Sequence, residues 1–120
     1  MKKTFLITPI AKPRMTRSDR WKKRPCVIRY WDYKTRLQAQ LDLYGIVIED
    51  VIKVKFGVPM PKSWSKKKKK EMQEKPHQQR PDVDNLAKGL MDSLFQEDSH
   101  IHTLHAKKVW SDVGYIEFDY

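Results

Sequence analysis

Alternating apolar and polar residues predict several β-strands. From Ile52 to Val58 every second residue is apolar, with Lys53 and Lys55 between them. This period of two is typical of a strand with one buried face. Shorter apolar runs predict further strands at 4–8, 101–110 and 114–120. Turn-forming residues at 111–114 predict that the last two strands form a β-hairpin.

Two other stretches have the apolar period of an α-helix. The first is predicted from Thr35 to about Ile48, and Gly45 is expected to weaken its last turn. The second is predicted to begin at Asp82 or Asp84 and to end near Phe95. The apolar positions that define the two helices are Leu37, Leu41, Tyr44 and Ile48 in the first, and Leu86, Leu90, Met91 and Leu94 in the second.

Strands and helices in one chain of 120 residues predict a single α+β domain covering residues 1–120. The stretch 12–25 is predicted to be a loop, because it contains prolines and cations but no apolar period. Ser63 is predicted to cap a short basic helix, with a flexible loop as the alternative. No apolar run is long enough for a membrane span or a signal peptide. The single cysteine, Cys26, fits a cytoplasmic protein.

The net charge of +10 is concentrated in two segments. Residues 1–36 contain twelve Lys or Arg and two acidic residues, residues 62–80 contain eight and two, and residues 81–120 contain three and eight. Dense positive charge suits a polyanion, because each neutralised phosphate releases counterions. A solvated basic surface is the ordinary alternative. The candidate DNA-binding residues are Lys12, Arg14, Arg17, Lys66, Lys67, Lys68, Lys69 and Arg80.

The run from Arg80 to Lys88, RPDVDNLAK, places two carboxylates two residues apart. Side chains at this spacing point about 200° apart on a helix, so both can face one point only if Asp82 precedes the helix. Pro81 favours that arrangement. Two carboxylates with water suit Mg²⁺, and Lys88, one turn after Asp84, would meet a phosphate. The alternative is ordinary capping by either aspartate and an ion pair between Asp84 and Lys88.

A second acidic pair, Glu97-Asp98, follows the second helix, and a polar turn is an equally good reading of it. The run RPDVDNLAK, followed by MDSL at 91–94 and EDSHI at 97–101, resembles the RusA family of Holliday junction resolvases, in the form found in phages and prophages. The sequence KPR at 12–14 and the run MPKSWS before the lysines at 66–70 resemble the same family.

The resemblance implies a RusA-like α+β fold with a small mixed β-sheet flanked by helices. It also implies a homodimeric, Mg²⁺-dependent endonuclease that cuts four-way DNA junctions symmetrically in recombination and repair, with no other cofactor. It assigns the metal to Asp82, Asp84 and Asp98, and catalysis to these three and Lys88. The segment between Leu94 and Glu97 is shorter than in the best-known members, so Glu97 remains open as the third ligand.

Two other functions remain open at this stage: a non-catalytic basic DNA-binding module, and a nuclease for branched or flap DNA in general. Zinc is disfavoured, because His100 and His102 would share one strand face while His105 would point the other way. Aromatic residues among the cations either stack on unpaired bases or pack, and packing is expected for at least two of them. These aromatic residues are Trp21, Tyr30, Trp31 and Tyr33.

Overall fold

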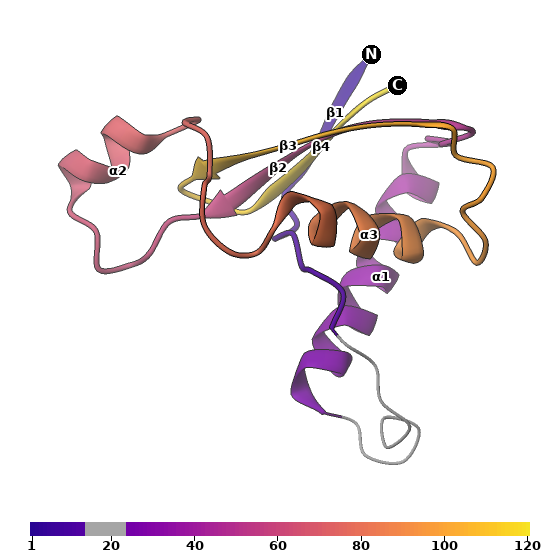
Figure 1. The fold of residues 1–120 in the computed structure, drawn as a ribbon, viewed down its shortest axis with the longest axis horizontal. Helices are drawn as coiled ribbons and strands as arrows, with labels where there is room; N and C mark the ends of the chain where they lie inside the picture. Colours follow the sequence, from indigo (N-terminus) through magenta and orange to yellow (C-terminus); the bar gives the residue numbers. More distant parts are fainter. Residues whose placement is uncertain (14–23) are drawn as a thin grey trace.

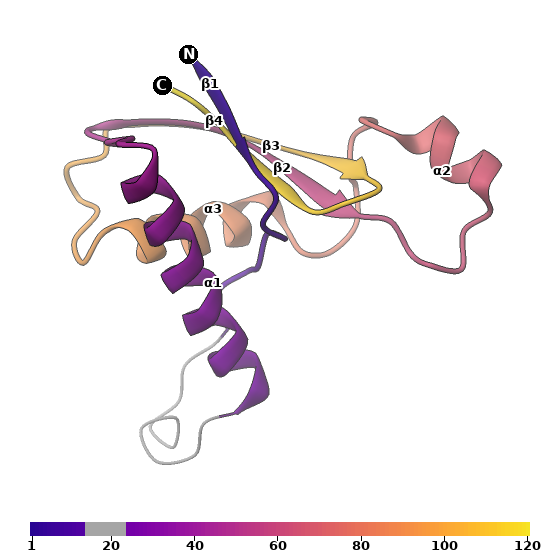
Figure 2. The same ribbon diagram turned by 180° about the vertical axis from the view of Figure 1, so that it is seen from behind.

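The computed structural model describes residues 1–13 and 24–120, and it contains a four-stranded sheet with two long helices on one face (Figures 1 and 2). This mixed α+β architecture confirms the predicted fold class. Arg14, Arg17 and Trp21 lie outside the described residues. The elements are β1 (Lys2–Phe5), α1 (Pro25–Leu43), β2 (Val51–Pro59), α2 (Lys66–Met72), α3 (Val83–Leu94), β3 (Thr103–Ser111) and β4 (Tyr115–Asp119).

The strand order is β1-β4-β2-β3, so the predicted hairpin of the last two strands is wrong. β2 lies between them, parallel to β3 and antiparallel to β4. The connection from Ser111 to Tyr115 therefore passes the end of β2. Four Cα steps can span the two strand spacings, about 9.6 Å, that separate β3 from β4. A short connection suggests neighbouring strands, but backbone hydrogen bonds over the whole sheet decide the pairing.

The predicted alternation of β2 is confirmed. Ile52, Val54 and Phe56 are buried in the core that the sheet shares with α1 and α3. The opposite face of the sheet, here called the open face, carries Lys53 and Lys55 of β2. On the same face, the residues that pair with this part of β2 are His105 and Lys107 of β3 and Tyr115 and Glu117 of β4.

Gly57 sits under the aromatic ring of Tyr115 on the open face. A Cβ atom on Gly57 would lie 2.1 Å from that ring, so only a glycine leaves room for the ring at this point.

The helix predicted at 35–48 is the second half of α1, which begins ten residues earlier at Pro25. Proline suits a first helical position, and buried Val27, Tyr30 and Tyr33 extend the apolar face toward it. The sequence pattern missed this half because charged residues are interspersed among these apolar ones. The buried rings of Tyr30 and Tyr33 confirm that two of the aromatic residues pack, whereas Trp31 is 44% exposed.

α1 ends at Leu43, so the prediction that Tyr44 and Ile48 are helical is wrong. Gly45 has a φ of +64°, and its N–H donates to Asp42 O at 3.1 Å. The N–H of Ile46 donates to Leu41 O at 2.9 Å. These two bonds form the Schellman motif that ends many helices, so Gly45 terminates α1 rather than merely weakening it.

Three further boundaries differ from the sequence predictions. β1 covers Lys2–Phe5 rather than 4–8, because residues 2–5 pair with β4. β3 begins at Thr103, two residues later than predicted. α2 is capped by Ser65, not Ser63, and the Ser65 hydroxyl accepts a hydrogen bond from Lys68 N at 3.2 Å.

Within the described part of the chain, no helix has the length and hydropathy needed to cross a bilayer.

The segment after β1 crosses α3 at Gly89. A Cβ atom there would lie 2.8 Å from Ile10 O and 2.9 Å from Lys12 N, so the glycine permits the close crossing. The Tyr30 hydroxyl donates to Gly89 O at 2.9 Å and ties α1 to the same turn. α3 is thus held between the sheet, α1 and the N-terminal segment.

Candidate active site

Asp82 occupies the N-cap position of α3 in an extended conformation, with φ −69° and ψ 149°. It therefore lies outside the helix, as expected from Pro81; the Arg80–Pro81 peptide bond is cis. The Asp82 side chain makes no capping hydrogen bond, so the interpretation of this residue as an ordinary helix cap is not supported. Asp84 lies in the first helical turn, where the helix dipole favours a carboxylate. Both side chains are exposed.

The two carboxylates border one surface pocket at the amino end of α3. The pocket also has cationic side chains from two places, Arg80 just before the aspartates and Lys108 on β3. In such a pocket the carboxylates can bind a metal cation while the cationic side chains attract an anion. The residues that line the pocket are His77, Gln78, Gln79, Arg80, Asp82, Val83, Asp84 and Lys108.

Lys108 and His77 were not among the site residues predicted from the sequence. The Lys108 ammonium donates hydrogen bonds to the carbonyl oxygens of Gln79 and Pro81, the latter at 2.7 Å. His77 is 4% exposed, and its ring packs on Trp110 with the ring centroids 4.3 Å apart. Burial lowers the pKa of His77, and the charge of Lys108 lowers it further. No local pattern marks either residue, because their roles arise from contacts between β3 and residues 75–81.

Lys88 is exposed one helical turn after Asp84. The ion pairs found among the described residues do not include one between Asp84 and Lys88, so the ion pair expected if these residues were only structural is not observed. Asp92, a further turn along α3, accepts a hydrogen bond from the Lys12 ammonium at 2.9 Å. That bond raises the pKa of Lys12, and the charge of Asp98 adds to the effect. Lys12 therefore lies near the carboxyl half of α3, away from the pocket.

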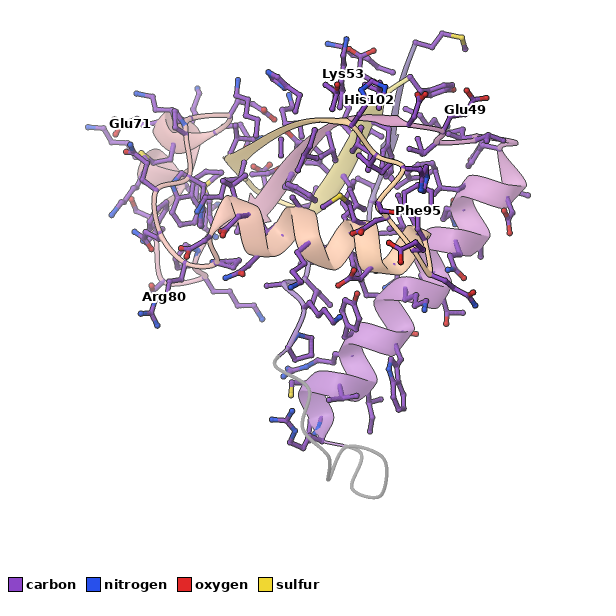
Figure 3. The ribbon with its side chains drawn as sticks, turned by 45° about the vertical axis from the view of Figure 1, so that its right-hand side comes forward. Glu49, Lys53, Glu71, Arg80, Phe95 and His102 are labelled. Carbon is purple, nitrogen blue, oxygen red and sulfur yellow. The ribbon has the colours of Figure 1, made fainter. Side chains whose placement is uncertain are left out.

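Asp98 follows the carboxyl end of α3, whereas Asp82 and Asp84 lie at its amino end. The rise from Asp84 to Leu94 alone is about 15 Å at 1.5 Å per residue. Figure 3 shows the labelled side chains of Arg80 and Phe95 near opposite ends of this helix. Among the described residues, no group of three or more His, Cys, Asp or Glu side chains is close enough to hold a metal ion. A single chain thus brings together two of the three predicted ligands.

Glu97 and Asp98 differ in what their side chains do. The Glu97 carboxylate accepts a hydrogen bond from Ser99 N at 3.0 Å and stabilises its own turn. The Asp98 carboxylate instead acts on Lys12 through its charge. Because the Glu97 carboxylate already accepts the bond from Ser99 N, Asp98 is the better candidate for a ligand.

The histidines that were considered for zinc lie apart from the pocket. His100 packs edge-on against Phe95, and His102 contacts Thr103 and Asp50. Both precede β3, so the prediction that they share a strand face is wrong.

The predicted DNA-binding lysines at 66–69 lie on α2, which has no buried residues and extends away from the sheet (Figure 1). Lys68 lies 4.2 Å above the ring of Trp64, and that ring packs on Trp110 of β3. Trp64 therefore connects α2 to the sheet by packing.

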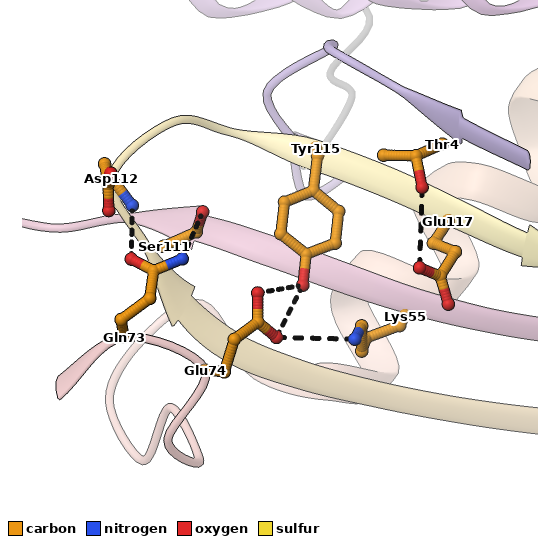
Figure 4. Close-up of polar contacts among 8 residues, drawn as sticks. All are labelled: Thr4, Lys55, Gln73, Glu74, Ser111, Asp112, Tyr115 and Glu117. Atoms are coloured by element: carbon orange, nitrogen blue, oxygen red, sulfur yellow. Dashed lines mark hydrogen bonds and ion pairs between the residues drawn. The ribbon is translucent and has the colours of Figure 1, made fainter.

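The chain that leaves α2 is tied to the open face of the sheet (Figure 4). The Glu74 carboxylate accepts hydrogen bonds from the Tyr115 hydroxyl, at 2.9 and 3.0 Å, and from Lys55 at 3.3 Å. Burial and the contact with Glu74 raise the pKa of Tyr115. The Gln73 side chain contacts Ser111 and Asp112 N. These bonds hold Glu74 at a φ of +64°, a conformation that non-glycine residues rarely adopt.

The chain was compared with models of known protein families. The model described as endodeoxyribonuclease RusA matches residues 7–118. A search of curated proteins found no match.

Proposed function

The chain belongs to the RusA family of endodeoxyribonucleases, and we propose that it resolves four-way DNA junctions by paired, Mg²⁺-dependent cleavage. Membership of the family makes it a hydrolase of phosphodiester bonds in DNA. The observation that carries the finer proposal is the pair Asp82 and Asp84, whose carboxylates share a pocket with Arg80 and Lys108 and make no hydrogen bond or ion pair within the described part of the chain.

The residues of the pocket fit a hard divalent cation. Asp82 and Asp84 offer carboxylate oxygens, which Mg²⁺ prefers, and their exposure leaves room for the waters that this ion retains. When bound, Mg²⁺ would supply an activated water and neutralise negative charge on the phosphate.

The cationic side chains of the chain position the DNA. Arg80, at the pocket, donates a fork of N–H groups that matches two phosphate oxygens. Lys88, one turn along α3, presents an ammonium group to the charge that develops on the cleaved phosphate. The lysines of α2 neutralise phosphates farther along a junction arm and so add affinity without sequence readout.

A homodimer fits both the reaction and the position of Asp98. Two symmetric cuts require two sites related by a two-fold axis. Such an axis running across α3 would pair the helices of the two protomers antiparallel. The Asp98 side chain of one protomer would then lie beside Asp82 and Asp84 of the other, and each metal site would take its third carboxylate from the partner.

The proposal is tested with a synthetic four-way junction, a linear duplex and a flap, each incubated with Mg²⁺. We expect cleavage of the junction, and loss of cleavage in Asp84→Asn by more than the roughly 10–100-fold typical of changes around a metal ligand. Binding of the junction in Ca²⁺ should persist in this variant, since removing a negative charge does not weaken attraction to DNA.

Asp112→Asn is the matched control, because Asp112 is an exposed acid in the β3–β4 connection, away from the pocket. It should cut like the unmodified protein. Full cutting by Asp84→Asn would refute the metal role. Equal cutting of flap and junction would indicate a broader branched-DNA nuclease, and binding without cutting would indicate a non-catalytic module.

A further inference from the structure

We propose that Lys108 is a positioning residue of the nuclease site, which holds the loop 78–81 so that Asp82 faces the same point as Asp84. This inference rests on the proposed function, because it takes the two aspartates as metal ligands. Lys108 lies 24 residues after Asp84 in the chain and on a different element.

The side chain of Lys108 contacts the loop directly before Asp82. Its ammonium is partly buried and donates to two carbonyl oxygens, those of Gln79 and Pro81. The Pro81 carbonyl belongs to the peptide bond that joins Pro81 to Asp82. Hydrogen bonds from a charged donor are stronger than neutral ones, so this contact restrains the backbone that sets the direction of the Asp82 side chain.

The backbone around Lys108 anchors the preceding segment as well. Trp110 exchanges hydrogen bonds with residues 74–75, and His77 N donates to Lys108 O at 3.2 Å. The segment 74–77 therefore pairs with the carboxyl half of β3. Where this pairing ends, the Lys108 side chain continues the attachment to residues 79–81. In the register of the sheet Lys108 lies opposite Phe56, which is fully buried, so the attachment starts from a rigid strand.

The charge of Lys108 suits the same role. Two carboxylates that border one pocket repel each other before a cation binds, and a fixed ammonium nearby reduces that repulsion. His77, also at the pocket, keeps an uncharged ring near neutral pH because its pKa is lowered. Two of the three N–H donors of Lys108 are already used by carbonyl oxygens. Such a cation is placed to hold protein backbone rather than to bind DNA phosphate.

The test compares Lys108→Met with Lys108→Arg and Lys107→Met in the full chain. Methionine keeps an unbranched stem but removes the charge and the donors, whereas arginine keeps both. Lys107 is exposed on the open face of the same strand, so Lys107→Met is a matched loss of charge.

The first readout is amide hydrogen exchange of residues 78–84 in protein without metal. We expect faster exchange there in Lys108→Met, near-normal exchange in Lys108→Arg, and no change in Lys107→Met. Unchanged exchange in Lys108→Met would overturn the proposal, as would the same acceleration in Lys107→Met. If Lys108→Met does not fold, Lys108→Gln, which keeps N–H donors on a shorter uncharged side chain, must show the faster exchange for the proposal to stand.

The second readout is the Mg²⁺ dependence of junction cleavage. We expect Lys108→Met to lower kcat by about 10–100-fold and to raise the Mg²⁺ concentration for half-maximal rate, with KM for DNA little changed. A higher KM with unchanged exchange would instead make Lys108 a phosphate contact and refute the positioning role. If the unmodified protein cuts no DNA with Mg²⁺, the proposed function fails, while hydrogen exchange still decides whether Lys108 orders the loop.

Discussion

The backbone conformation of a single residue decides what its carboxylate can do in this protein. Asp82 stands in extended conformation just before α3, and its side chain is left free. Glu74 has a left-handed backbone, and its carboxylate is used to hold Tyr115 and Lys55. The first case has a local cause in Pro81, so the sequence predicted it. The second depends on a strand 41 residues away, and no local pattern marks it.

His77 makes stability depend on pH in a definite direction. Burial and Lys108 lower its pKa below the ordinary value of 6.5. The unfolded chain therefore binds a proton that the folded chain does not, in the window between the lowered pKa and 6.5. The stabilisation is complete above 6.5 and is lost as the pH falls through the lowered pKa.

His77→Phe keeps a ring against Trp110 but has no group to protonate there. When the pH is lowered from about 7.5 to 5, we expect its free energy of unfolding to fall by less than that of the unmodified protein. Urea unfolding at the two pH values measures the difference. His105→Phe, which changes an exposed histidine on β3, is the control. An equal loss of stability in His77→Phe and the unmodified protein would contradict the assignment.

Among the elements, α3 separates the acidic residues and α2 carries the cations. α3 has Asp84 in its first turn and Asp98 beyond its end, so the helix itself keeps the two apart. α2 buries no residue and is held by the Ser65 cap, by Trp64 and by the bonds of Gln73 and Glu74. Its exposed lysines are therefore free to meet a polyanion.

We expect Lys66→Gln combined with Lys67→Gln to weaken junction binding and to reduce the slope of log affinity against log salt by roughly 1.5–2, because each phosphate contact contributes about 0.9. The cleavage rate at saturating DNA should not change, since α2 does not line the pocket. Binding titrations at several salt concentrations measure the slope.

Lys53→Gln combined with Lys107→Gln removes the same charge from the open face and is the control for α2. An equal loss of slope in this variant would mean that the total charge, and not α2, determines DNA binding.

For the molecule as a whole, the positions of Asp84 and Asp98 predict how two chains cooperate. If each site takes Asp98 from the partner subunit, then a dimer of one Asp84→Asn chain and one Asp98→Asn chain contains one intact site and one with both changes. We expect this mixed dimer to nick one strand of the junction, whereas neither variant alone cuts. Differently tagged chains, co-expressed and purified through both tags, allow the nicked product to be measured.

A mixed dimer of Asp82→Asn and Asp84→Asn is the control. Each chain supplies both Asp82 and Asp84 to one of the two sites. Each site in this dimer therefore carries one substitution, and no nicking is expected. Absence of nicking in the Asp84→Asn and Asp98→Asn pair would show that each chain supplies its own third ligand, whereas cutting by the Asp98→Asn variant alone would show that no third ligand is needed.

The local part of the structure was predictable because its causes are local. The period of two in β2 reports one buried strand face, and it is confirmed by Ile52, Val54 and Phe56. Pro81 predicted that Asp82 precedes α3. The start of α1 at Pro25 was missed, because interspersed charged residues obscure the apolar face that only packing against α3 and the sheet makes evident.

By itself, the sequence determined the fold class, the family motif and the position of Asp82 before α3, since apolar periods, motifs and a proline can be recognised along the chain. Only the tertiary structure decided the strand order, the bond of Lys12 to Asp92, the hold of Lys108 on the loop and the distance of Asp98 from the pocket. The physical reason is the range of the interactions. Caps and periods act within one or two turns, whereas these contacts join residues that meet only after the sheet and helices have packed.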